Sequence, residues 1–439
     1  MNINYMFKNK LDEKNLILLL LPQQSYQRFI SIFTILFLFL FSFFCISGFT
    51  ISYSDNNNNQ TNHEELIGVD MKGMYTSLNY KKFPNITITS DYYDDSFKLI
   101  KNIGMNHVRY VLYWEAYENN PTLFLKELEN VANLADKLGL KVIYDNHQFH
   151  TSSWLDYKRG TGFPSFLFDK HLYPIDSGVT TSSNSTTTTG VWWTNWWNRN
   201  ITDQETEVDG WILQAHFLKT LVKLLDTHTS TKGYEILNEP QVFSTDQWPK
   251  IGKYYEYMIN ELRQQTNKTI VIDMTIPIKF NDLVINVTSA NMAKIIPKDG
   301  NSIFKISLYG IPTDDNYQER KLELLMNASK IANIPIYVGE WNHVTREKKL
   351  TEKNTADDIS KINSTNSDLT QDESNILVKK FASLKVYGWA FWNWNYVSTP
   401  PQNFNLITVA TNGDILPTKY FYILKNSVDK LNMNTTSKT

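Results

Sequence analysis

The stretch that decides the fold is an apolar strand that ends in an amide and a carboxylic acid, Gly233-Tyr234-Glu235-Ile236-Leu237-Asn238-Glu239-Pro240. Because a proline disfavours helical backbone in the residue before it, the strand is expected to end in a turn at Glu239. Functional groups at the carboxyl end of a strand are typical of barrels of parallel strands, where the chemistry sits at that end. The stretch therefore predicts one functional strand of such a barrel.

A second strand of the same design, residues 334–341, carries Glu340 near its end. The chain between Glu239 and Glu340 is long enough for three strand–helix units of about 30 residues or more each. This spacing allows two strands of one barrel wall to bring their carboxyl groups to the same site.

Apolar periodicity alternates between strand and helix from residue 65 to residue 431. The predicted strands are 66–73, 107–114, 141–145, 233–240, 269–274, 302–309, 334–341 and 386–393. The predicted helices are 94–104, 123–138, 207–225, 247–263, 281–293, 316–331, 372–384 and 418–431. Strands that alternate with helices indicate a parallel sheet covered by helices, and eight of each favour an α/β fold of the closed (β/α)8 TIM barrel type.

Two insertions interrupt this pattern. The first is a long loop after the third strand, between His147 and about Asp203, and the second is a polar stretch after the seventh strand, residues 351–370. The first contains a hydroxyl-rich tract, 180–189, followed by a cluster of tryptophans. A loop longer than about 15 residues in a compact domain is usually functional or disordered. We therefore expect Trp193 and Trp196 to stack on substrate, with a buried plug as the alternative.

The amino-terminal region predicts export. Residues 29–51 have no charge and are mostly Phe, Leu and Ile, which is long enough for a bilayer that needs about 20 apolar residues. Lysines precede this segment and acidic residues follow it, so the rest of the chain is expected outside the membrane, in the secretory pathway. Residues 1–54 are then a cleaved signal peptide or an uncleaved membrane anchor, and the sequence leaves both open.

The remaining domain boundaries follow from composition. Residues 55–64 form an asparagine-rich spacer, 65–431 the folded domain, and 432–439 a polar tail. The single cysteine, Cys45, lies in the apolar segment, so the exported part has no disulfide and no thiolate metal site. N-glycosylation sequons fit a secretory route and occur at Asn59, Asn85, Asn184, Asn200, Asn267, Asn286, Asn327, Asn363 and Asn434.

Charge and histidine spacing argue against several classes of partner. The net charge is −2 and the basic residues are scattered, which gives no reason to expect a nucleic-acid partner. His150, His171 and His343 have no spacing suited to zinc. We therefore expect neither a metal nor a cofactor.

The two glutamates suit the cleavage of glycosidic bonds by double displacement, in which two carboxyl groups lie about 5–5.5 Å apart. Glu239 would protonate the leaving oxygen, and Glu340 would remain ionised and attack the anomeric carbon. A positive Arg109 and a donating Tyr309 near Glu340 would favour its charged form. Such a pair predicts retention of anomeric configuration.

Other strand ends supply groups for holding a sugar. Asn238 is expected to bind the 2-hydroxyl, and Trp392 offers a flat face beneath a pyranose ring. His147, at the end of the third strand, is expected in the same shell. Glu235 has the parity of Glu239 along its strand, so we expect it inside the barrel in a buried ion pair and not in contact with substrate.

The ordered set of these motifs resembles glycoside hydrolase family 5, the cellulase-type retaining enzymes. The resemblance covers nearly all of residues 65–431 and rests on Val108-Arg109, Asp145-Asn146-His147, Leu237-Asn238-Glu239-Pro240, Tyr309, Gly339-Glu340 and Phe391-Trp392. It implies Glu239 as acid/base, Glu340 as nucleophile, and Arg109, His147, Asn238, Tyr309 and Trp392 around the substrate. Members often carry a histidine two residues before the sixth-strand tyrosine, where this chain has Ser307.

The resemblance implies a carbohydrate substrate and leaves its identity open. A cellulase-like endo-β-1,4-glucanase is the leading expectation, with a β-mannanase or an enzyme that cleaves glycosphingolipids as alternatives. A carbohydrate-binding barrel without catalysis is the alternative from another class, although binding alone does not require two carboxyl groups. A membrane partner is expected only through an uncleaved amino-terminal segment.

Overall fold

The structure is a computed structural model that describes residues 64–82, 90–177, 187–273, 288–309, 317–342, 369–395, 405–410 and 413–436. The expected signal or anchor (1–54), nearly all of the spacer, most of the polar insertion 351–370 and the end of the tail lie outside the described residues. Among the described residues, no helix has the length and apolar character needed to cross a bilayer.

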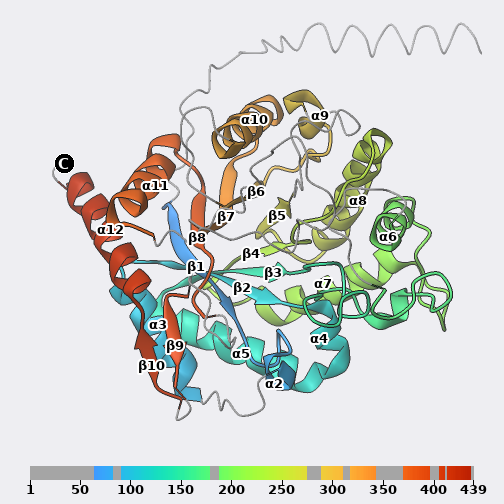
Figure 1. Cartoon of the computed structure of the whole chain (residues 1–439), viewed down its shortest axis with the longest axis horizontal. Coiled ribbons are helices and arrows are strands. Elements are labelled where there is room, and N and C mark those ends of the chain that lie inside the picture. The colour runs from blue at the N-terminus through green and yellow to red at the C-terminus, as the bar shows by residue number, and fades with distance from the viewer. Residues whose placement is uncertain are drawn as a thin grey trace, which may run out of the picture. The chain divides into compact units, whose positions relative to one another are not determined.

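Eight parallel strands close into a barrel in the order of the sequence, as predicted (Figure 1). They are β1 (Leu66–Lys72), β2 (His107–Leu112), β3 (Lys141–Asn146), β4 (Thr231–Glu235), β5 (Thr269–Asp273), β6 (Ser302–Tyr309), β7 (Ile336–Asn342) and β8 (Gly388–Phe391). The barrel closes where Leu66 of β1 pairs with Gly388 of β8. A Cβ on Gly388 would lie 2.5 Å from the carbonyl oxygen of Leu66, so only glycine permits this approach.

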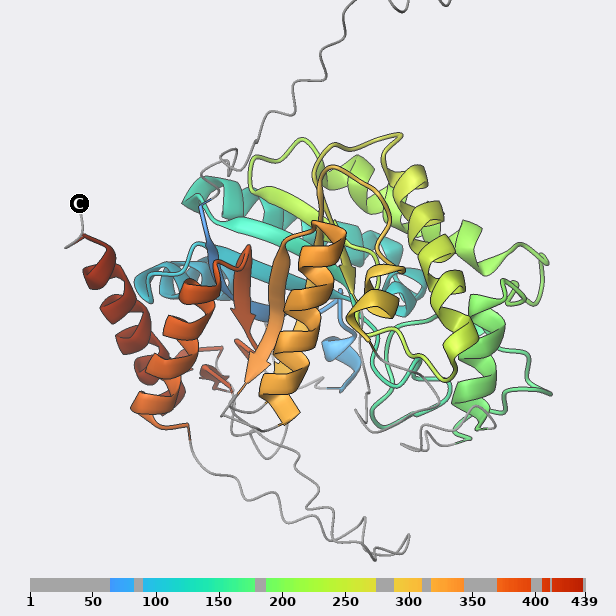
Figure 2. The ribbon, with the colours of Figure 1, turned by 90° about the horizontal axis from the view of Figure 1, so that it is seen from above.

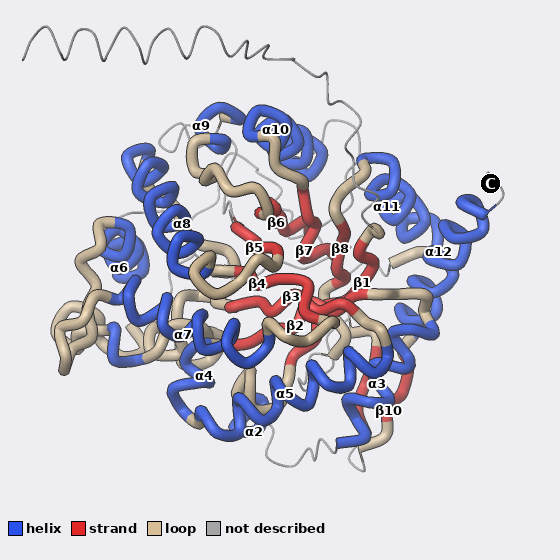
Figure 3. Tube along the Cα trace, turned by 180° about the vertical axis from the view of Figure 1, so that it is seen from behind, coloured by secondary structure: helices blue, strands red, loops and turns tan. Residues whose placement is uncertain are grey.

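The helices form a ring outside the strands, which is clearest from the opposite side in Figure 3. The long ones are α3 (Ser90–Asn102), α5 (Pro121–Leu138), α7 (Gly210–Leu225), α8 (Trp248–Leu262), α10 (Tyr317–Ala332), α11 (Gln371–Leu384) and α12 (Lys419–Thr436). Short helices are α2 (Asn79–Lys82), α4 (Trp114–Asn119) and α9 (Ser289–Ala293). The predicted helix 281–293 is confirmed only at α9, because residues 281–287 lie outside the described part.

Local sequence signals explain where individual helices begin and end. Asn120 caps α5 by accepting a hydrogen bond from the Leu123 amide at 3.1 Å, and Gly139 ends the helix with φ of 70°. Thr370 and Glu373 form a capping box at the start of α11. The apolar periodicity predicted the ends of these two helices to within a few positions, and the capping residues fix them.

Besides short helical segments such as α2 and α4, a longer helix and a pair of strands were not predicted. Residues Thr188–Trp197 form a helix, α6, which lies outside the barrel near α7 and α8 (Figures 1 and 2). The strands β9 (Ile407–Val409) and β10 (Ile415–Pro417) form an antiparallel pair outside the barrel, and β10 contacts α3 and α12. The alternation rule accounts only for barrel units, so it gives no signal for either element.

The barrel interior is layered along its axis. Its amino-terminal end is filled by apolar side chains: Leu66, Ile143, Val271, Ile303, Tyr337 and Ala390. Inward positions nearer the carboxyl ends carry charges instead, and we call this set the charged layer: Asp70, Arg109, Asp145, Glu235, Asp273, Lys305 and Glu340. Three of these charged residues come two positions after one of the apolar residues just named, and two positions is the strand period: Asp145, Asp273 and Lys305. The charged layer is therefore the floor of the carboxyl-terminal face.

Two irregularities aim the glutamates. The predicted strand 233–240 ends earlier, at Glu235, and Glu239 lies in a turn with φ of 46°. In β7 the register shifts at Gly339, because Ile306 pairs with Val338 but Ser307 pairs with Glu340. Tyr337 faces the interior, so strict alternation would turn Glu340 outward, and the bulge at Gly339 returns it to the interior.

Candidate active site

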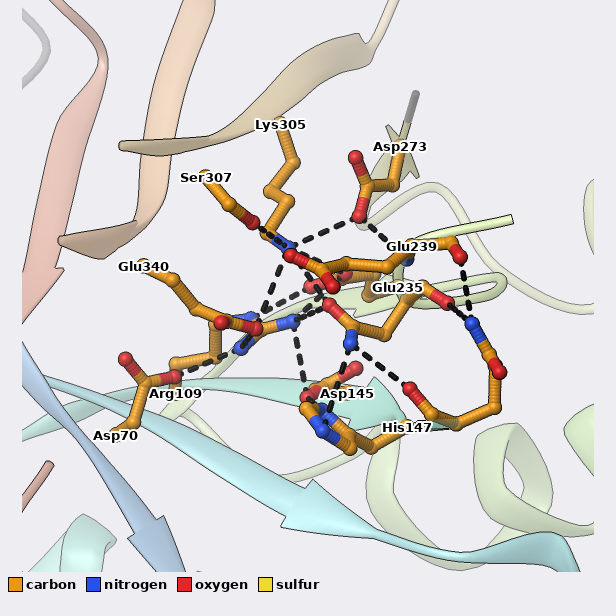
Figure 4. Close-up of polar contacts among 12 residues, drawn as sticks. Asp70, Arg109, Asp145, His147, Glu235, Glu239, Asp273, Lys305, Ser307 and Glu340 are labelled. Carbon is orange, nitrogen blue, oxygen red and sulfur yellow. Dashed lines mark hydrogen bonds and ion pairs between the residues drawn. The ribbon is translucent and has the colours of Figure 1, made fainter. Parts of the chain in front are cut away.

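Arg109 is the centre of the charged layer (Figure 4). It binds both carboxylate oxygens of Glu235, with Nε to Oε2 at 2.7 Å and Nη2 to Oε1 at 2.8 Å. Nη1 also donates to Asp70 Oδ1 at 2.8 Å and to Glu340 Oε1 at 3.0 Å. The buried ion pair expected for Glu235 is confirmed. Arg109 has no exposed surface, so it supports the site from below and does not reach substrate directly, contrary to our expectation.

Glu340 is 3% exposed and is surrounded by donors. Its Oε1 accepts from Arg109 and from Lys305 Nζ at 3.3 Å, while Oε2 accepts from the Tyr309 hydroxyl at 2.6 Å. Burial alone would raise the pKa of Glu340, but the charges of Lys305 and Arg109 and the Tyr309 hydrogen bond hold it well below its ordinary value. The carboxylate therefore stays ionised, as the roles expected for Arg109 and Tyr309 require.

Asn238 and Glu239 follow β4 side by side. The Asn238 Oδ1 accepts from Arg109 Nη2 at 2.9 Å and from Lys305 Nζ at 2.6 Å, which fixes the orientation of the amide. The Gln148 side chain donates to the backbone carbonyls of Asn238 and Glu239 at 3.0 and 2.5 Å. The Glu239 amide donates to Asp273 Oδ2 at 2.7 Å. The left-handed backbone of Glu239, uncommon outside glycine, is thus held by contacts on both sides of its peptide.

His147 and Trp392 lie together beside these groups. His147 Nδ1 is 2.8 Å from Asp145 Oδ2, and its ring stacks on Trp392 with centroids 5.4 Å apart. Burial lowers the pKa of His147 to about 3, so the ring is neutral. A neutral ring whose Nδ1 donates to Asp145 leaves Nε2 as an acceptor. Trp392 is half-buried, and Lys72 Nζ lies 4.8 Å from its ring centre.

Sequence reasoning missed Asp70, Asp273 and Lys305, all of which belong to the charged layer. Each is buried next to apolar residues of its strand: Val69-Asp70-Met71, Ile272-Asp273 and Phe304-Lys305-Ile306. A charged residue inside an apolar strand was the available signal, because charges are almost never fully buried unless paired. Ser307, which stands where related enzymes often carry histidine, accepts from Lys305 Nζ at 2.8 Å.

The charged layer contains more carboxyl groups than cations, and their proton affinities differ. Burial raises the pKa of Asp145 to about 7 against the charges of Arg109 and Lys305, and it raises the pKa of Asp273 to about 7 against the charge of Lys305. Burial likewise raises the pKa of Asp70 and of Glu235. Glu340 shifts in the opposite direction. The layer thus keeps one carboxylate firmly ionised while its neighbours can take up protons, a separation typical of functional sites.

The prediction that Trp193 and Trp196 contact substrate is wrong. Both are on α6, and both have no exposed surface. Trp196 stacks on Trp192 with centroids 5.4 Å apart and meets the edge of Tyr254 in α8, while Trp193 Nε1 donates to Thr151 Oγ1 at 2.9 Å. The prediction failed because the polar residues before the tryptophans suggested a loop, whereas the tryptophans form part of an apolar packing surface. We call residues 149–209, which include α6, the aromatic insertion.

Of the three histidines whose spacing does not suit zinc, the structure describes two, His150 and His171. His150 Nδ1 is 2.8 Å from Asp156 Oδ2, and its ring stacks on Phe149. His171 is exposed, and its amide donates to Asp169 at 2.7 Å. His343 lies outside the described residues.

Solved structures of glycosidases share this fold. An endogalactoceramidase has a TM-score of 0.55 and 15% identity, over 83% of this chain and 80% of that chain. Endo-glycoceramidase II from Rhodococcus sp., as a lactosyl-enzyme intermediate, has a TM-score of 0.55 and 14% identity, over 82% and 78%. A triple mutant of an endo-beta-1,4-glucanase from Xanthomonas axonopodis pv. citri has a TM-score of 0.50 and 14% identity, over 84% and 100%. No curated protein sequence matches the chain.

Membership of a family follows from the sequence itself. The model of the cellulase family, glycosyl hydrolase family 5, matches residues 64–398, which include every strand of the barrel and both glutamates. This span is more than half of the chain, and it agrees with the closed barrel and with the resemblance drawn from the motifs. The chain is therefore a glycoside hydrolase and belongs to the cellulase family, glycosyl hydrolase family 5.

Proposed function

We propose that this protein hydrolyses β-glycosidic bonds with retention of configuration, with Glu340 as nucleophile and Glu239 as acid/base. The observation that carries the proposal is the surroundings of Glu340. Two cations and a tyrosine hydroxyl contact its carboxylate, and its pKa lies well below the ordinary value. A nucleophilic carboxylate has to be ionised before the sugar arrives, and these contacts maintain that state.

The reaction would proceed in two displacements. In the first, a carboxylate oxygen of Glu340 forms a bond to the anomeric carbon while the glycosidic oxygen leaves with a proton from Glu239. In the second, Glu239 removes a proton from water, which attacks the anomeric carbon and releases Glu340 as a carboxylate. Tyr309, which is half-buried, contacts the buried carboxylate of Glu340. Glu239 and Trp392 are half-buried, so each exposes part of its surface to a sugar. The structure of the Rhodococcus enzyme as a lactosyl-enzyme intermediate supports a glycosyl-enzyme as the product of the first displacement.

Asn238 and His147 would orient the sugar bound to Glu340. The Asn238 amide nitrogen donates to the Gln148 carbonyl at 3.1 Å and lies 3.4 Å from His147 Nε2. The contact with His147 is longer than a good hydrogen bond, so a sugar 2-hydroxyl could replace it by accepting from the Asn238 nitrogen or by donating to His147 Nε2. Such contacts strengthen in the transition state of glycoside cleavage.

We propose a β-1,4-glucan cut internally as the substrate, in keeping with the family model and with the activity of the Xanthomonas neighbour. A second candidate is a glycosphingolipid, because two neighbours with TM-scores of 0.55 are named an endogalactoceramidase and an endo-glycoceramidase. The test is release of sugar by the full-length protein from soluble β-glucan, mannan and a glycolipid. Release from the glycolipid alone would overturn the glucan assignment.

The roles of the glutamates have a separate test. Glu340→Gln should lower kcat by roughly 10⁴-fold or more, as loss of a nucleophile does in other enzymes, while sugar binding survives. Labelling with a dinitrophenyl 2-deoxy-2-fluoro-β-glycoside should add one sugar to Glu340, detected by peptide mass spectrometry. Undiminished turnover in Glu340→Gln would place the nucleophile elsewhere and would equally leave the binding-only barrel without support.

We also propose that the chain is exported through its apolar segment 29–51 and remains outside the membrane. Fractionation of cells that express the full-length protein, followed by sequencing of its mature amino terminus, tests this. A terminus near residue 54 indicates cleavage, an intact one in the membrane fraction indicates an anchor, and recovery in the cytosol contradicts the proposal.

A further inference from the structure

Lys305 lies between the groups proposed for catalysis. It is the fourth residue of β6 and has no exposed surface. Its ammonium group contacts Asn238 Oδ1 at 2.6 Å, Ser307 Oγ at 2.8 Å, Asp273 Oδ2 at 2.9 Å and Glu340 Oε1 at 3.3 Å. Every one of these partners is an oxygen atom of the site, so the ammonium group makes its hydrogen bonds there.

Asp273 extends this contact to the other glutamate. The same oxygen that accepts from Lys305, Oδ2, accepts from the backbone amide of Glu239 at 2.7 Å. A continuous chain of hydrogen bonds therefore runs from Glu340 through Lys305 and Asp273 to Glu239, as Figure 4 shows. It joins strands β7, β6 and β5 to the turn after β4.

The backbone on both sides fits this chain. Glu239 has φ of 46°, a conformation that costs about 1–3 kcal/mol in a residue with a side chain and needs support from its surroundings. On the other side, a Cβ on Gly339 would lie 2.5 Å from Lys305 Cγ and 2.9 Å from Cε. The glycine at the β7 bulge thus leaves the space through which the lysine stem reaches the site.

We propose that Lys305 and Asp273 form a positioning pair that fixes the Glu239 backbone and the Glu340 carboxylate in one mutual geometry. In this role neither residue contacts the sugar. The proposal rests on the roles proposed above for Glu239 and Glu340, and it assigns to this pair the alignment that those roles require.

Electrostatics agree with the geometry. Burial raises the pKa of Glu340, and among the interactions that lower it the charge of Lys305 has the largest effect, ahead of that of Arg109. Without Lys305 the pKa of Glu340 should therefore rise. The titratable groups that interact with this carboxylate come from several strands and are Asp70, Arg109, Asp145, His147, Lys305 and Tyr309. Only Lys305 also touches Asp273, so its loss should affect both glutamates.

The test compares Lys305→Met and Asp273→Asn in the full-length protein. Each is assayed with dinitrophenyl β-cellobioside, whose leaving group needs no proton, and with a cello-oligosaccharide, whose leaving group does. Lys305→Met should lower kcat roughly 100-fold on both, as a misplaced reacting group does, and should move the acidic limb of the pH profile upward. Asp273→Asn should slow the oligosaccharide much more than the dinitrophenyl substrate, because it loosens the acid, Glu239.

Two matched variants complete the design. Lys141→Met removes a lysine at the amino-terminal start of β3, where Nζ contacts the Thr229 carbonyl at 3.2 Å, and should leave both activities unchanged. Gly339→Ala keeps the charge of Lys305 but displaces its stem, and should reproduce the fall in kcat with little change in KM. If Lys305→Met does not fold, Asp273→Asn and Gly339→Ala decide the question.

The outcomes separate the two proposals. If Glu340 of the wild-type protein is not labelled by the dinitrophenyl 2-deoxy-2-fluoro-β-glycoside, the proposed function fails regardless of Lys305. If Glu340 is labelled, but Asp273→Asn slows both substrates equally and Lys305→Met leaves the acidic limb in place, the pair is merely structural. Wild-type kcat in both variants would overturn the positioning role outright.

Discussion

The charged layer inside the barrel and the α6 tryptophans of the aromatic insertion outside it are both buried, yet they are opposite kinds of side chain. In the charged layer, Arg109 and Lys305 hold buried carboxyl groups by ion pairs of 2.7–3.3 Å. In the aromatic insertion, Trp192, Trp193, Trp196 and Trp197 pack on one another and on α8.

This difference indicates what each region contributes. Burying ion pairs is costly, and apolar residues of similar volume often give equal or greater stability. A charged layer is therefore best explained by the site that it forms. Burying aromatic rings is favourable by itself, and the rings carry the exposed loop segments of the insertion on a rigid base. Chemistry and packing are thus separated between two regions, and the following predictions test that separation.

The largest effect is expected from Arg109→Met. It would leave the carboxylates of Glu235 and Asp70 buried without their main partner, which typically costs about 3–5 kcal/mol. The matched change in the aromatic insertion is Arg199→Met, which loses a partly exposed ion pair with Asp209 and contacts with two aromatic rings. It should cost about 1 kcal/mol. Urea unfolding measures both, and equal losses would contradict the separation.

Two tryptophan changes come next: one should cost a similar amount of stability but no activity, and the other should have a smaller effect, on activity alone. Trp196→Ala should lower stability by about 3–5 kcal/mol through the cavity it leaves, while the protein that remains folded keeps its kcat/KM. Trp392→Ala should leave the unfolding temperature nearly unchanged and lower kcat/KM about fivefold to tenfold, in line with the value of one aromatic contact. Thermal unfolding and steady-state kinetics on the same samples decide it. A loss of specific activity in folded Trp196→Ala would restore this residue to the site.

The smallest effect expected is a pH dependence of stability. The pKa of Asp145 and of Asp273 is about 7 in the folded protein and near 3.8 when unfolded, so the folded state binds more protons in this range. Their contribution is present at low pH and is lost as the pH rises through 7. The histidines with lowered pKa, His107 and His147, act oppositely but only below 6.5.

Stability should therefore fall between pH 6.5 and 7.5, by at most about 1.4 kcal/mol per pH unit for each proton. Denaturant unfolding across that range is the measurement, and Asp273→Asn should flatten the slope. The ion pair of Asp94 and Lys98 on α3 offers a control, because the pKa of Asp94 is lowered and that of Lys98 is raised, so Asp94→Asn should not alter the slope in this range. A stability that rises from pH 6.5 to 7.5 would contradict the raised pKa values.

The amino-acid sequence by itself determined the barrel and most of the groups that face its carboxyl end. Alternating apolar periods predicted the strands and helices, and most of their described boundaries lie within a few residues of the prediction, because core burial and helix caps are local properties. The glutamates, Asn238, Tyr309 and the buried role of Glu235 followed from their positions along strands.

Only the tertiary structure decided how charges and rings are shared between the two regions. Lys305 and Asp273 come from different strands, and their meeting depends on the register of the closed barrel and on the bulge at Gly339. The burial of Trp193 and Trp196 depends on Tyr254 and Thr151, which are distant in the sequence. A local pattern records which face of an element is apolar, but it does not record which other element will cover that face.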